Sequence, residues 1–358
     1  MIDKKFWKNK RVLVTGHTGF KGGWLSLWLK LLGAKVYGYS LNPITKKNFF
    51  NETKLKKIFA KEVRKNIQNK KEIENFIKKN KPQIIFHLAA QPQVLESFND
   101  PVNTIYSNII GTVNLLESIR KKKYIKALIN ITTDKVYKNS EKNIKFKEDF
   151  CLGGDDIYSS SKASADIITL SYIKSFFGNS SCNISTVRAG NCIGGGDWTK
   201  YRILTDSVSA FYKKKELIIR RPKAKRPWQH LLEPLAGYII LAQKLCSKKG
   251  KKFNGAWNFG PDRRIHLSVL EFAEIFGKKL NPMFKIKIRK ATDKREKMNL
   301  DLDSSKAKIK LKWKTFLSIQ KTLSMTAEWY LANHKKRDML DFTSKQILEF
   351  NKYFNKKK

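Results

Sequence analysis

The sequence is poor in acidic residues. Asp and Glu number 30 against 74 Lys and Arg, so the formal net charge is +44. A balance of this kind ordinarily suggests a nucleic acid or an anionic surface as a partner. Arginine, the better reader of bases, supplies only 13 of the 74 cations, and the lysines are spread along the chain. Lysine with abundant Asn and Ile is also what an A+T-rich coding composition produces, and we favour this interpretation over a functional polycation.

Several other absences narrow the class of protein. No apolar run approaches the roughly 18–20 residues that span a bilayer, and residues 1–10 lack the apolar stretch of a signal peptide. Cysteine is rare and forms no CxxC pair, so we expect buried, reduced thiols at Cys151, Cys182, Cys192 and Cys246. The five histidines show no metal-ligand spacing. We therefore expect a cytoplasmic protein that binds neither a metal nor a membrane.

The chain does contain enough apolar material for a large core. Its 358 residues, 41% of them hydrophobic, suit one large domain or two ordinary ones. Short apolar runs typical of buried strands alternate with segments of helical spacing. The runs cover residues 11–15, 34–41, 83–88, 126–133 and 183–188, and the helical segments cover 20–32, 71–79, 104–121 and 157–177. This alternation predicts an α/β fold with a doubly wound parallel sheet, whose ligands bind at the carboxyl ends of the strands.

The regular alternation weakens after about residue 190, where Gly and Pro mark loops. We expect helices over 231–246, 268–280 and 318–333, followed by a basic tail that frays. The sequence thus predicts a dinucleotide-binding domain over 1–190 and a smaller C-terminal substrate domain over 191–345. A segment of about 231–262 is expected to return to the first domain.

Three glycines follow the first predicted strand. Gly16, Gly19 and Gly22 form GxxGxxG at the start of the helix over 20–32. One glycine permits a tight turn, another lets the backbone approach a pyrophosphate, and the third allows close helix–strand packing. The strand–turn–helix context predicts a Rossmann dinucleotide site that includes Thr18 and Phe20, with the phosphates at the helix N-terminus.

The second predicted strand ends at Asn42. A dinucleotide site usually has an acid here, which accepts from the adenosine ribose. Asn42 can bond a hydroxyl but does not repel a 2′-phosphate by charge. The choice between NAD and NADP therefore stays open at this position.

A second group of residues has the chemistry of an active site. Tyr158 and Lys162 lie four residues apart on a predicted helix, so both side chains share one face. A nearby ammonium favours the phenolate, so we expect a lowered pKa for Tyr158, which could then take the proton of a sugar hydroxyl. Thr133, Asp134 and Lys135 follow the strand over 126–133 and should lie at the same sheet edge, where Thr133 could donate to that hydroxyl.

These segments together resemble the extended short-chain dehydrogenase/reductases that act on nucleotide sugars. Longer stretches over nearly the whole chain narrow the resemblance to the CDP-glucose 4,6-dehydratase family. The most specific stretches are TGHTGFKGGWLSLWL (15–29), HLAAQP (87–92), TTDKVY (132–137), VRAGNCIGGGDW (187–198) and RPWQHLLEPLAGY (226–238). Asp-Lys after the Thr is the telling pair, since the dTDP-glucose dehydratases have Asp-Glu there and epimerases lack the acid.

The resemblance implies NAD-dependent dehydration of CDP-glucose to CDP-4-keto-6-deoxy-glucose. Tyr158, helped by Lys162, would deprotonate the hydroxyl on carbon 4 while NAD takes the hydride. Thr133 would polarise the carbon 4 oxygen, and Asp134 would protonate the departing carbon 6 hydroxyl. Lys135 stands where relatives have a Glu base, so either Lys135 or Tyr158 would take the carbon 5 proton.

The resemblance also implies ligand-binding residues and partners. The cofactor site would include Leu88, Ala89 and Ala90 of HLAAQP, with Tyr158 and Lys162. The nucleotide sugar would be bound by Gln91, Thr133, Asn191 and Arg226. The family implies homodimers or homotetramers, and a product that feeds deoxysugar and lipopolysaccharide O-antigen synthesis.

The chain departs from the family in places. Asn42, Asn66 and Asn69 stand where relatives carry Asp near the adenosine, and Leu95 and Phe98 stand where Arg and Tyr are usual. A dehydratase of another nucleotide-glucose and a nucleotide-sugar 4-epimerase are therefore retained as alternatives. A basic nucleic-acid-binding protein on a Rossmann fold is a remote alternative, because the sequence contains no recognition-helix motif or basic-aromatic array.

Overall fold

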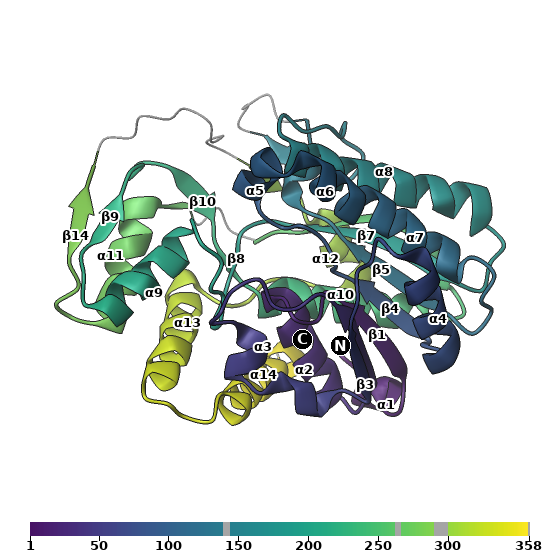
Figure 1. The fold of residues 1–358 in the computed structure, drawn as a ribbon, viewed down its shortest axis with the longest axis horizontal. Helices are drawn as coiled ribbons and strands as arrows, with labels where there is room; N and C mark the ends of the chain where they lie inside the picture. Colours follow the sequence, from purple (N-terminus) through teal and green to yellow (C-terminus); the bar gives the residue numbers. More distant parts are fainter. Residues whose placement is uncertain (139–143, 262–265, 290–299, 357–358) are drawn as a thin grey trace.

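A seven-stranded parallel sheet forms the centre of the larger lobe (Figure 1). The computed structural model describes residues 1–138, 144–261, 266–289 and 300–356. The strand order is β12-β7-β5-β4-β1-β2-β3, and every neighbouring pair is parallel. The strands are β1 (Arg11–Thr15), β2 (Lys35–Ser40), β3 (Lys61–Arg64), β4 (Ile84–His87), β5 (Ala127–Ile131), β7 (Asn183–Ala189) and β12 (Gly255–Phe259). The predicted doubly wound fold is confirmed.

Alternate side chains of the central strands enter two separate cores. Val12 and Val14 of β1 pack on one face of the sheet with α2 (Phe20–Leu31) and α10 (Leu232–Leu245), whereas Leu13 enters the core on the other face. That second face is covered by three helices, which are α4 (Lys70–Asn80), α7 (Gly111–Ile119) and α8 (Ile157–Phe176). Both faces of the strands are buried, which explains why these segments are nearly continuous apolar runs.

The helix predicted over 104–121 has an irregular middle. It comprises α6 (Pro101–Ile105), a π-helical turn η2 (Tyr106–Ile110) and α7 (Gly111–Ile119). The shorter α5 (Val94–Asn99) precedes it, and α5 and α6 both contact α8. The sequence pattern did not predict the π-helical turn.

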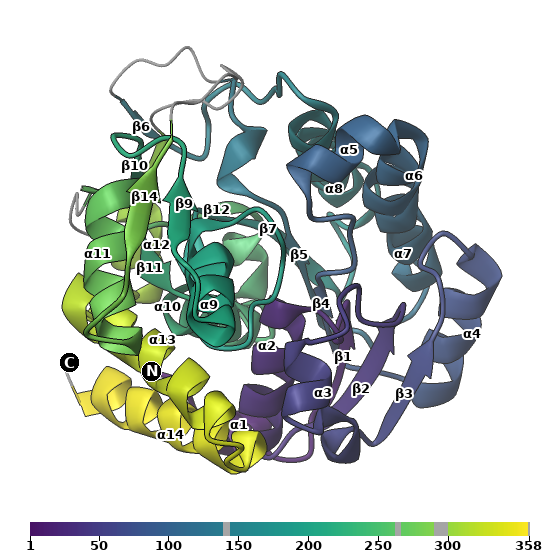
Figure 2. The same cartoon turned by 60° about the vertical axis from the view of Figure 1, so that its left-hand side comes forward.

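The second, smaller lobe lies at the left in Figure 1 and comes forward in Figure 2. Its elements are α9 (Ile203–Lys213), β9 (Leu217–Ile219), β10 (Lys225–Pro227), β13 (His266–Ser268), α11 (Val269–Leu280), β14 (Ile286–Ile288) and α13 (Ile319–His334). Ser268 begins α11 with a complete capping box, in which Glu271 is the reciprocal partner. Short elements complete the chain, namely α1 (Lys4–Trp7), α3 (Phe49–Glu52), η1 (Leu55–Ile58), η3 (Asp134–Val136), β6 (Lys145–Phe146), β8 (Cys192–Ile193), β11 (Gln229–His230), η4 (Gly250–Phe253), β15 (Asp301–Leu302) and α12 (Ser305–Leu311).

The chain crosses between the two lobes more than once. After β10 it returns to the larger lobe, where α10 packs on the sheet and β12 pairs with β7. It then goes back to build β13, α11 and β14. The boundary predicted at residue 190 stays a prediction, since the lobes are interleaved in sequence.

The expected frayed tail is wrong. Residues 339–356 form α14 (Met339–Lys356), which packs against α2 and α13. Phe350 of α14 is 2% exposed and meets the ring of Trp28 at 5.5 Å. The two chain ends are joined, because the backbone amide of Ile2 donates to the side chain of Asn355 at 3.3 Å.

The cysteines differ partly from expectation. All four thiols are free, but only Cys182 is buried and Cys151 is exposed. Cys151 lies next to a two-residue turn after β6 rather than in the sheet, so no packed face covers it. Within the described ranges, none of the helices combines the length and apolarity needed to cross a membrane.

Candidate active site

The glycine loop joins β1 to α2 at the carboxyl edge of the sheet. Gly16 adopts a φ of +73°, and a Cβ there would lie 2.7 Å from the backbone of Leu88 and Ala89. A Cβ on Gly22 would collide with the Gly16 carbonyl oxygen. Gly19 is the N-cap residue of α2, and no side chain caps the helix. The uncapped amides and the positive helix end suit a diphosphate, so the residues present fit a dinucleotide cofactor.

Neutral polar side chains connect the glycine loop to the end of β2. The Thr18 hydroxyl bonds the Ser40 hydroxyl at 2.8 Å and donates to the Leu41 carbonyl at 3.0 Å, which ties the loop to the end of β2. Asn42 is exposed two residues beyond β2. Phe20 is the first residue of α2, and its side chain is partly buried against the main core. Only its backbone amide, in the first helical turn, is therefore placed to meet a cofactor phosphate.

The asparagines that replace acids have local structural roles. Asn66 accepts from the backbone amide of Gln68 at 3.0 Å, and Asn69 caps α4 by accepting from Glu72 at 3.2 Å. The sequence did not predict the ionic cluster beside them, where Arg64 pairs with Glu62 and lies 2.9 Å from His17. Burial, followed by the Arg64 charge, lowers the pKa of His17 to about 3.

The segment after β4 is fixed by its neighbours. The amide of Ala89 donates to the Thr15 hydroxyl at 3.2 Å, which places Leu88, Ala89 and Ala90 beside the glycine loop. The Gln91 amide donates to Asn108 at 2.8 Å. Asn108, in the π-helical turn, also donates to the Ser161 hydroxyl at 2.8 Å and so connects this segment to α8.

Thr133, Asp134 and Lys135, here called the catalytic turn, follow β5. Thr133 caps the 3₁₀ turn η3, and its hydroxyl lies 3.0 Å from an Asp134 carboxylate oxygen. Burial raises the pKa of Asp134, against the opposing effect of Lys135 and Thr133. A carboxyl with a raised pKa keeps its proton more readily, as a general acid must.

Tyr158 and Lys162 lie in the first turns of α8 and face the catalytic turn. Thr133 lies near enough to the Tyr158 phenol to oppose a rise in its pKa, and the Lys162 ammonium donates to the Ile131 carbonyl at 2.8 Å. Burial raises the pKa of Tyr158 to about 12 and lowers the pKa of Lys162 to about 8. The predicted lowering of the Tyr158 pKa is therefore wrong for this structure, because burial outweighs nearby cations and Lys162 bonds the backbone.

Two cations were not predicted at this site. Lys21, in the first turn of α2, lowers the pKa of Asp134, of Lys162 and of Cys192, so its ammonium lies among them. Arg202, the N-cap residue of α9, pairs with buried Asp197 at 2.8 Å and lowers the pKa of Tyr158. Arg202 comes from the second lobe, so no local pattern placed it here. Lys21 could have been found, since it lies within the glycine motif.

The two remaining predicted substrate-site residues lie after β7 and within β10. Asn191 lies between β7 and β8, where its carbonyl accepts from the amide of Gln229 at 3.2 Å. Arg226 lies within β10, and its side chain is outside the part that the structure describes. The functional roles predicted for both residues stay predictions.

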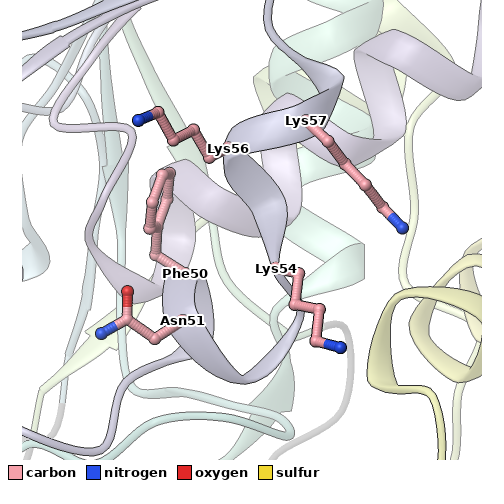
Figure 3. Close-up of a pocket in the computed structure, with 5 residues that line it drawn as sticks. All are labelled: Phe50, Asn51, Lys54, Lys56 and Lys57. Carbon is pink, nitrogen blue, oxygen red and sulfur yellow. The ribbon is translucent and has the colours of Figure 1, made fainter.

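A hollow of about 470 Å³ lies elsewhere, at α3 and η1 (Figure 3). Its lining residues are Phe50, Asn51, Lys54, Lys56 and Lys57, none of which was predicted in the site. In the close-up the Lys56 side chain points to the upper left, whereas those of Lys54 and Lys57 both point to the lower right. In the described part of the chain no three His, Cys, Asp or Glu side chains gather as a metal site would need.

The parallel sheet, the glycine loop and the Tyr158–Lys162 pair at one edge define an extended short-chain dehydrogenase/reductase. The sequence pattern of the GDP-mannose 4,6 dehydratase family matches residues 13–326. A CDP-glucose 4,6-dehydratase of Salmonella typhimurium is 39% identical over 98% of both chains. The chain therefore belongs to this family of nucleotide-sugar 4,6-dehydratases.

Solved structures share the fold. The dTDP-glucose 4,6-dehydratase of Bacillus anthracis in complex with NAD has a TM-score of 0.76, 24% identity and coverage of 92% of this chain and 99% of its own. The epimerase Mth375 of Methanothermobacter thermautotrophicus has a TM-score of 0.79, 19% identity and coverage of 93% and 95%. At these identities the likeness concerns the architecture, which dehydratases and epimerases have in common.

Proposed function

We propose that the protein is an NAD-dependent CDP-glucose 4,6-dehydratase that forms CDP-4-keto-6-deoxy-glucose and water. The supporting observation is the catalytic turn, whose Thr133 and Asp134 lie near enough to Tyr158 to influence its pKa and whose Lys135 lies beside Asp134. An epimerase needs no acid for a leaving hydroxyl. Together with the 39% identity to a named CDP-glucose 4,6-dehydratase, this constellation favours dehydration over epimerisation.

In the proposed mechanism, residues of the site carry out each proton transfer. When bound, NAD⁺ accepts the hydride of carbon 4 and returns it to carbon 6. Tyr158, acting as the phenolate, takes the carbon 4 hydroxyl proton and becomes the phenol, while the Thr133 hydroxyl donates to the same oxygen and stabilises the forming ketone. The ketone acidifies the hydrogen on carbon 5, which Lys135 or Tyr158 removes. Asp134 then protonates the departing carbon 6 hydroxyl.

Binding would engage groups on both lobes. The first turn of α2, with Leu88, Ala89 and Ala90, would hold the cofactor diphosphate and nicotinamide side. Gln91 and Asn191 would bind the sugar nucleotide, and Arg226 would donate two parallel bonds to its diphosphate. The Lys162 ammonium would orient the cofactor ribose and support the Tyr158 phenolate.

A product assay across three donors tests the proposal. The protein is incubated with NAD⁺ and CDP-, dTDP- or UDP-glucose, and the sugar nucleotide is analysed by mass spectrometry. Loss of one water from CDP-glucose in preference to the other donors is expected. An unchanged mass with all three would refute dehydration, and a carbon 4 epimer of unchanged mass would identify an epimerase. Full activity of Tyr158→Phe would refute the assigned proton acceptor.

We further propose a cytoplasmic homodimer or homotetramer that associates through α5, α6 and α8. Large apolar side chains are exposed on these adjoining helices, including Phe98 at 52%, Val102 at 62% and Ile167 at 50%. An exposed apolar surface of this kind is typical of an interface. Ile167→Glu should reduce the mass measured by light scattering, whereas Met283→Glu, at a position 77% exposed in the other lobe, should not. Equal masses for the Ile167 variant and the parent protein would exclude this surface.

A further inference from the structure

Beneath the catalytic turn lies a buried ion pair that the proposed mechanism does not use. Asp166 of α8 and Arg188 of β7 are both 0% exposed. The Arg188 guanidinium donates through two nitrogens to the two carboxylate oxygens of Asp166, each at 2.9 Å. A buried ion pair of this kind is weak evidence for stability, because its desolvation cost can cancel the attraction. Its remaining hydrogen bonds indicate a more specific role.

The Asp166 carboxylate binds the residue that directly precedes the catalytic turn. The Thr132 hydroxyl, directly before Thr133, donates to Asp166 at 2.9 Å. One helical turn earlier on α8, Lys162 donates to the carbonyl of Ile131 at 2.8 Å. Two successive residues at the end of β5 are thus bonded to two residues one turn apart on α8. These two bonds set the position of α8 along its axis relative to the end of β5, and so the position of Tyr158 relative to Thr133.

The Arg188 guanidinium binds Tyr137, which follows the catalytic turn. Its third nitrogen donates to the Tyr137 hydroxyl at 2.8 Å, and its carbon lies 4.9 Å from the centre of the Tyr137 ring. The Tyr137 hydroxyl in turn donates to Asn258 of β12 at 2.8 Å. Thr132 and Tyr137 therefore bracket the catalytic turn, and each is bonded to one member of the ion pair.

We infer that the Asp166–Arg188 pair is a positioning element of the active site, which holds both ends of the catalytic turn against α8. It acts through Thr132 and Tyr137 and touches no reacting atom. Small displacements of reacting groups cost rate steeply, so a turn held at both ends preserves the alignment of Thr133, Asp134 and Tyr158. The inference deepens the proposed function and rests on it for the activity measurements below.

The structure provides a matched pair of variants. Thr132 and Thr186 each donate one buried hydroxyl to Asp166 at 2.9 Å, but Thr186 lies on β7, away from the catalytic turn. Thr132→Val and Thr186→Val each remove a hydroxyl bonded to the same carboxylate and leave the ion pair in place, although the Thr132 hydroxyl also lies 3.2 Å from the Val187 carbonyl. A purely structural pair predicts similar effects of the two variants. A positioning pair predicts a loss of kcat for Thr132→Val alone.

For Thr132→Val we expect kcat to fall about 10- to 100-fold with little change in KM, and for Thr186→Val a change of kcat within about twofold. Tyr137→Phe, which frees the other end of the turn, should lower kcat as Thr132→Val does. Equal losses in the two threonine variants, or no loss in either, would overturn the inference.

Amide hydrogen exchange of residues 133–137 supplies a readout that needs no substrate. Faster exchange in Thr132→Val than in Thr186→Val is expected, and unchanged exchange in Thr132→Val overturns the inference even if activity falls. If the parent protein dehydrates none of the three sugar nucleotides, the proposed function fails. The exchange comparison then still decides whether the ion pair positions the turn.

Discussion

Burial shifts the pKa values of Tyr158 and Lys162 in opposite directions. The Tyr158 pKa lies near 12, whereas the Lys162 pKa lies near 8, because burial disfavours the charged form of each group. Groups on three elements bear on the Lys162 charge. Asp166 on the same helix raises the Lys162 pKa and Lys21 on α2 lowers it, while His87 on β4 faces the ammonium with its own pKa lowered to about 3, by burial and then by Lys162. Lys162 is thus the group that loses its proton just above neutral pH.

This difference predicts the alkaline limb of the pH profile. Although burial keeps the Tyr158 pKa high, an ammonium at Lys162 stabilises a phenolate forming nearby better than a neutral amine does, so kcat/KM should fall as pH rises through about 8, where the ammonium loses its proton. In Lys162→Arg the guanidinium stays charged, because its pKa exceeds about 12. The variant should be slower overall yet lack the fall near pH 8. Initial rates between about pH 6 and 10 measure both profiles, and an alkaline limb unchanged by Lys162→Arg would assign it to another group.

At the scale of elements, apolar periodicity predicted five strands of the sheet. It missed the two edge strands of the seven, which are β12 and β3. The residues of β3, Lys61–Arg64, form a polar strand at the sheet edge, where charged side chains are tolerated. It also missed α14, although Met339, Ile347, Phe350 and Phe354 repeat at helical spacing. The many lysines of this segment make it basic as a whole, which masks the apolar stripe in its sequence.

The site was predictable where its residues lie in one motif. The glycine loop, the catalytic turn and the Tyr158–Lys162 spacing are local patterns, and the structure brings all three to one sheet edge. Arg202 was not predictable, because it reaches Tyr158 only through the packing of the second lobe. The pKa of Tyr158 was not predictable either, since burial is a property of the folded chain.

The packing of α14 can be tested at two neighbouring positions. Phe350 is 2% exposed and contacts Trp28 and Phe316, whereas Tyr353, one turn on, is 50% exposed. Phe350→Ala should lower the free energy of unfolding by about 3–5 kcal/mol, the usual loss for a buried aromatic. Tyr353→Ala should change it by no more than about 0.5 kcal/mol. Urea denaturation measures both, and equal small effects would contradict the packing of this helix on α2.

For the whole molecule, three buried histidines predict acid sensitivity. Burial lowers the pKa of His17, His87 and His230 to about 3 each, from an ordinary value of 6.5. Below about pH 6.5 the unfolded chain binds protons that the folded chain does not, so stability present at neutral pH is lost as pH falls. The slope approaches about 1.4 kcal/mol per pH unit for each histidine.

Unfolding by urea at about pH 7.5, 6.0 and 5.0 tests this prediction. The midpoint should fall steeply below about pH 6.5. A midpoint that is constant across this range would mean that the histidines titrate normally in the folded chain.

The net charge of +44 also acts at the scale of the whole molecule. The site accounts for few of these cations, among them Lys21, Lys162 and Arg202. The remaining positive field would still attract an anionic sugar nucleotide and raise its encounter rate. Salt screens such a field, because the Debye length falls from about 10 Å at 0.1 M to about 3 Å at 1 M.

We therefore expect kcat/KM for CDP-glucose to fall several-fold as NaCl rises from about 0.05 to 0.5 M, with kcat unchanged, because screening affects encounter and not the bound complex. Sucrose at matched osmolality serves as the control, since it leaves the field unscreened. A parallel fall of kcat would show that salt acts on the chemistry or on the fold. A flat kcat/KM would mean that the lysines are spread too evenly to guide the substrate, which would make the charge a product of composition alone.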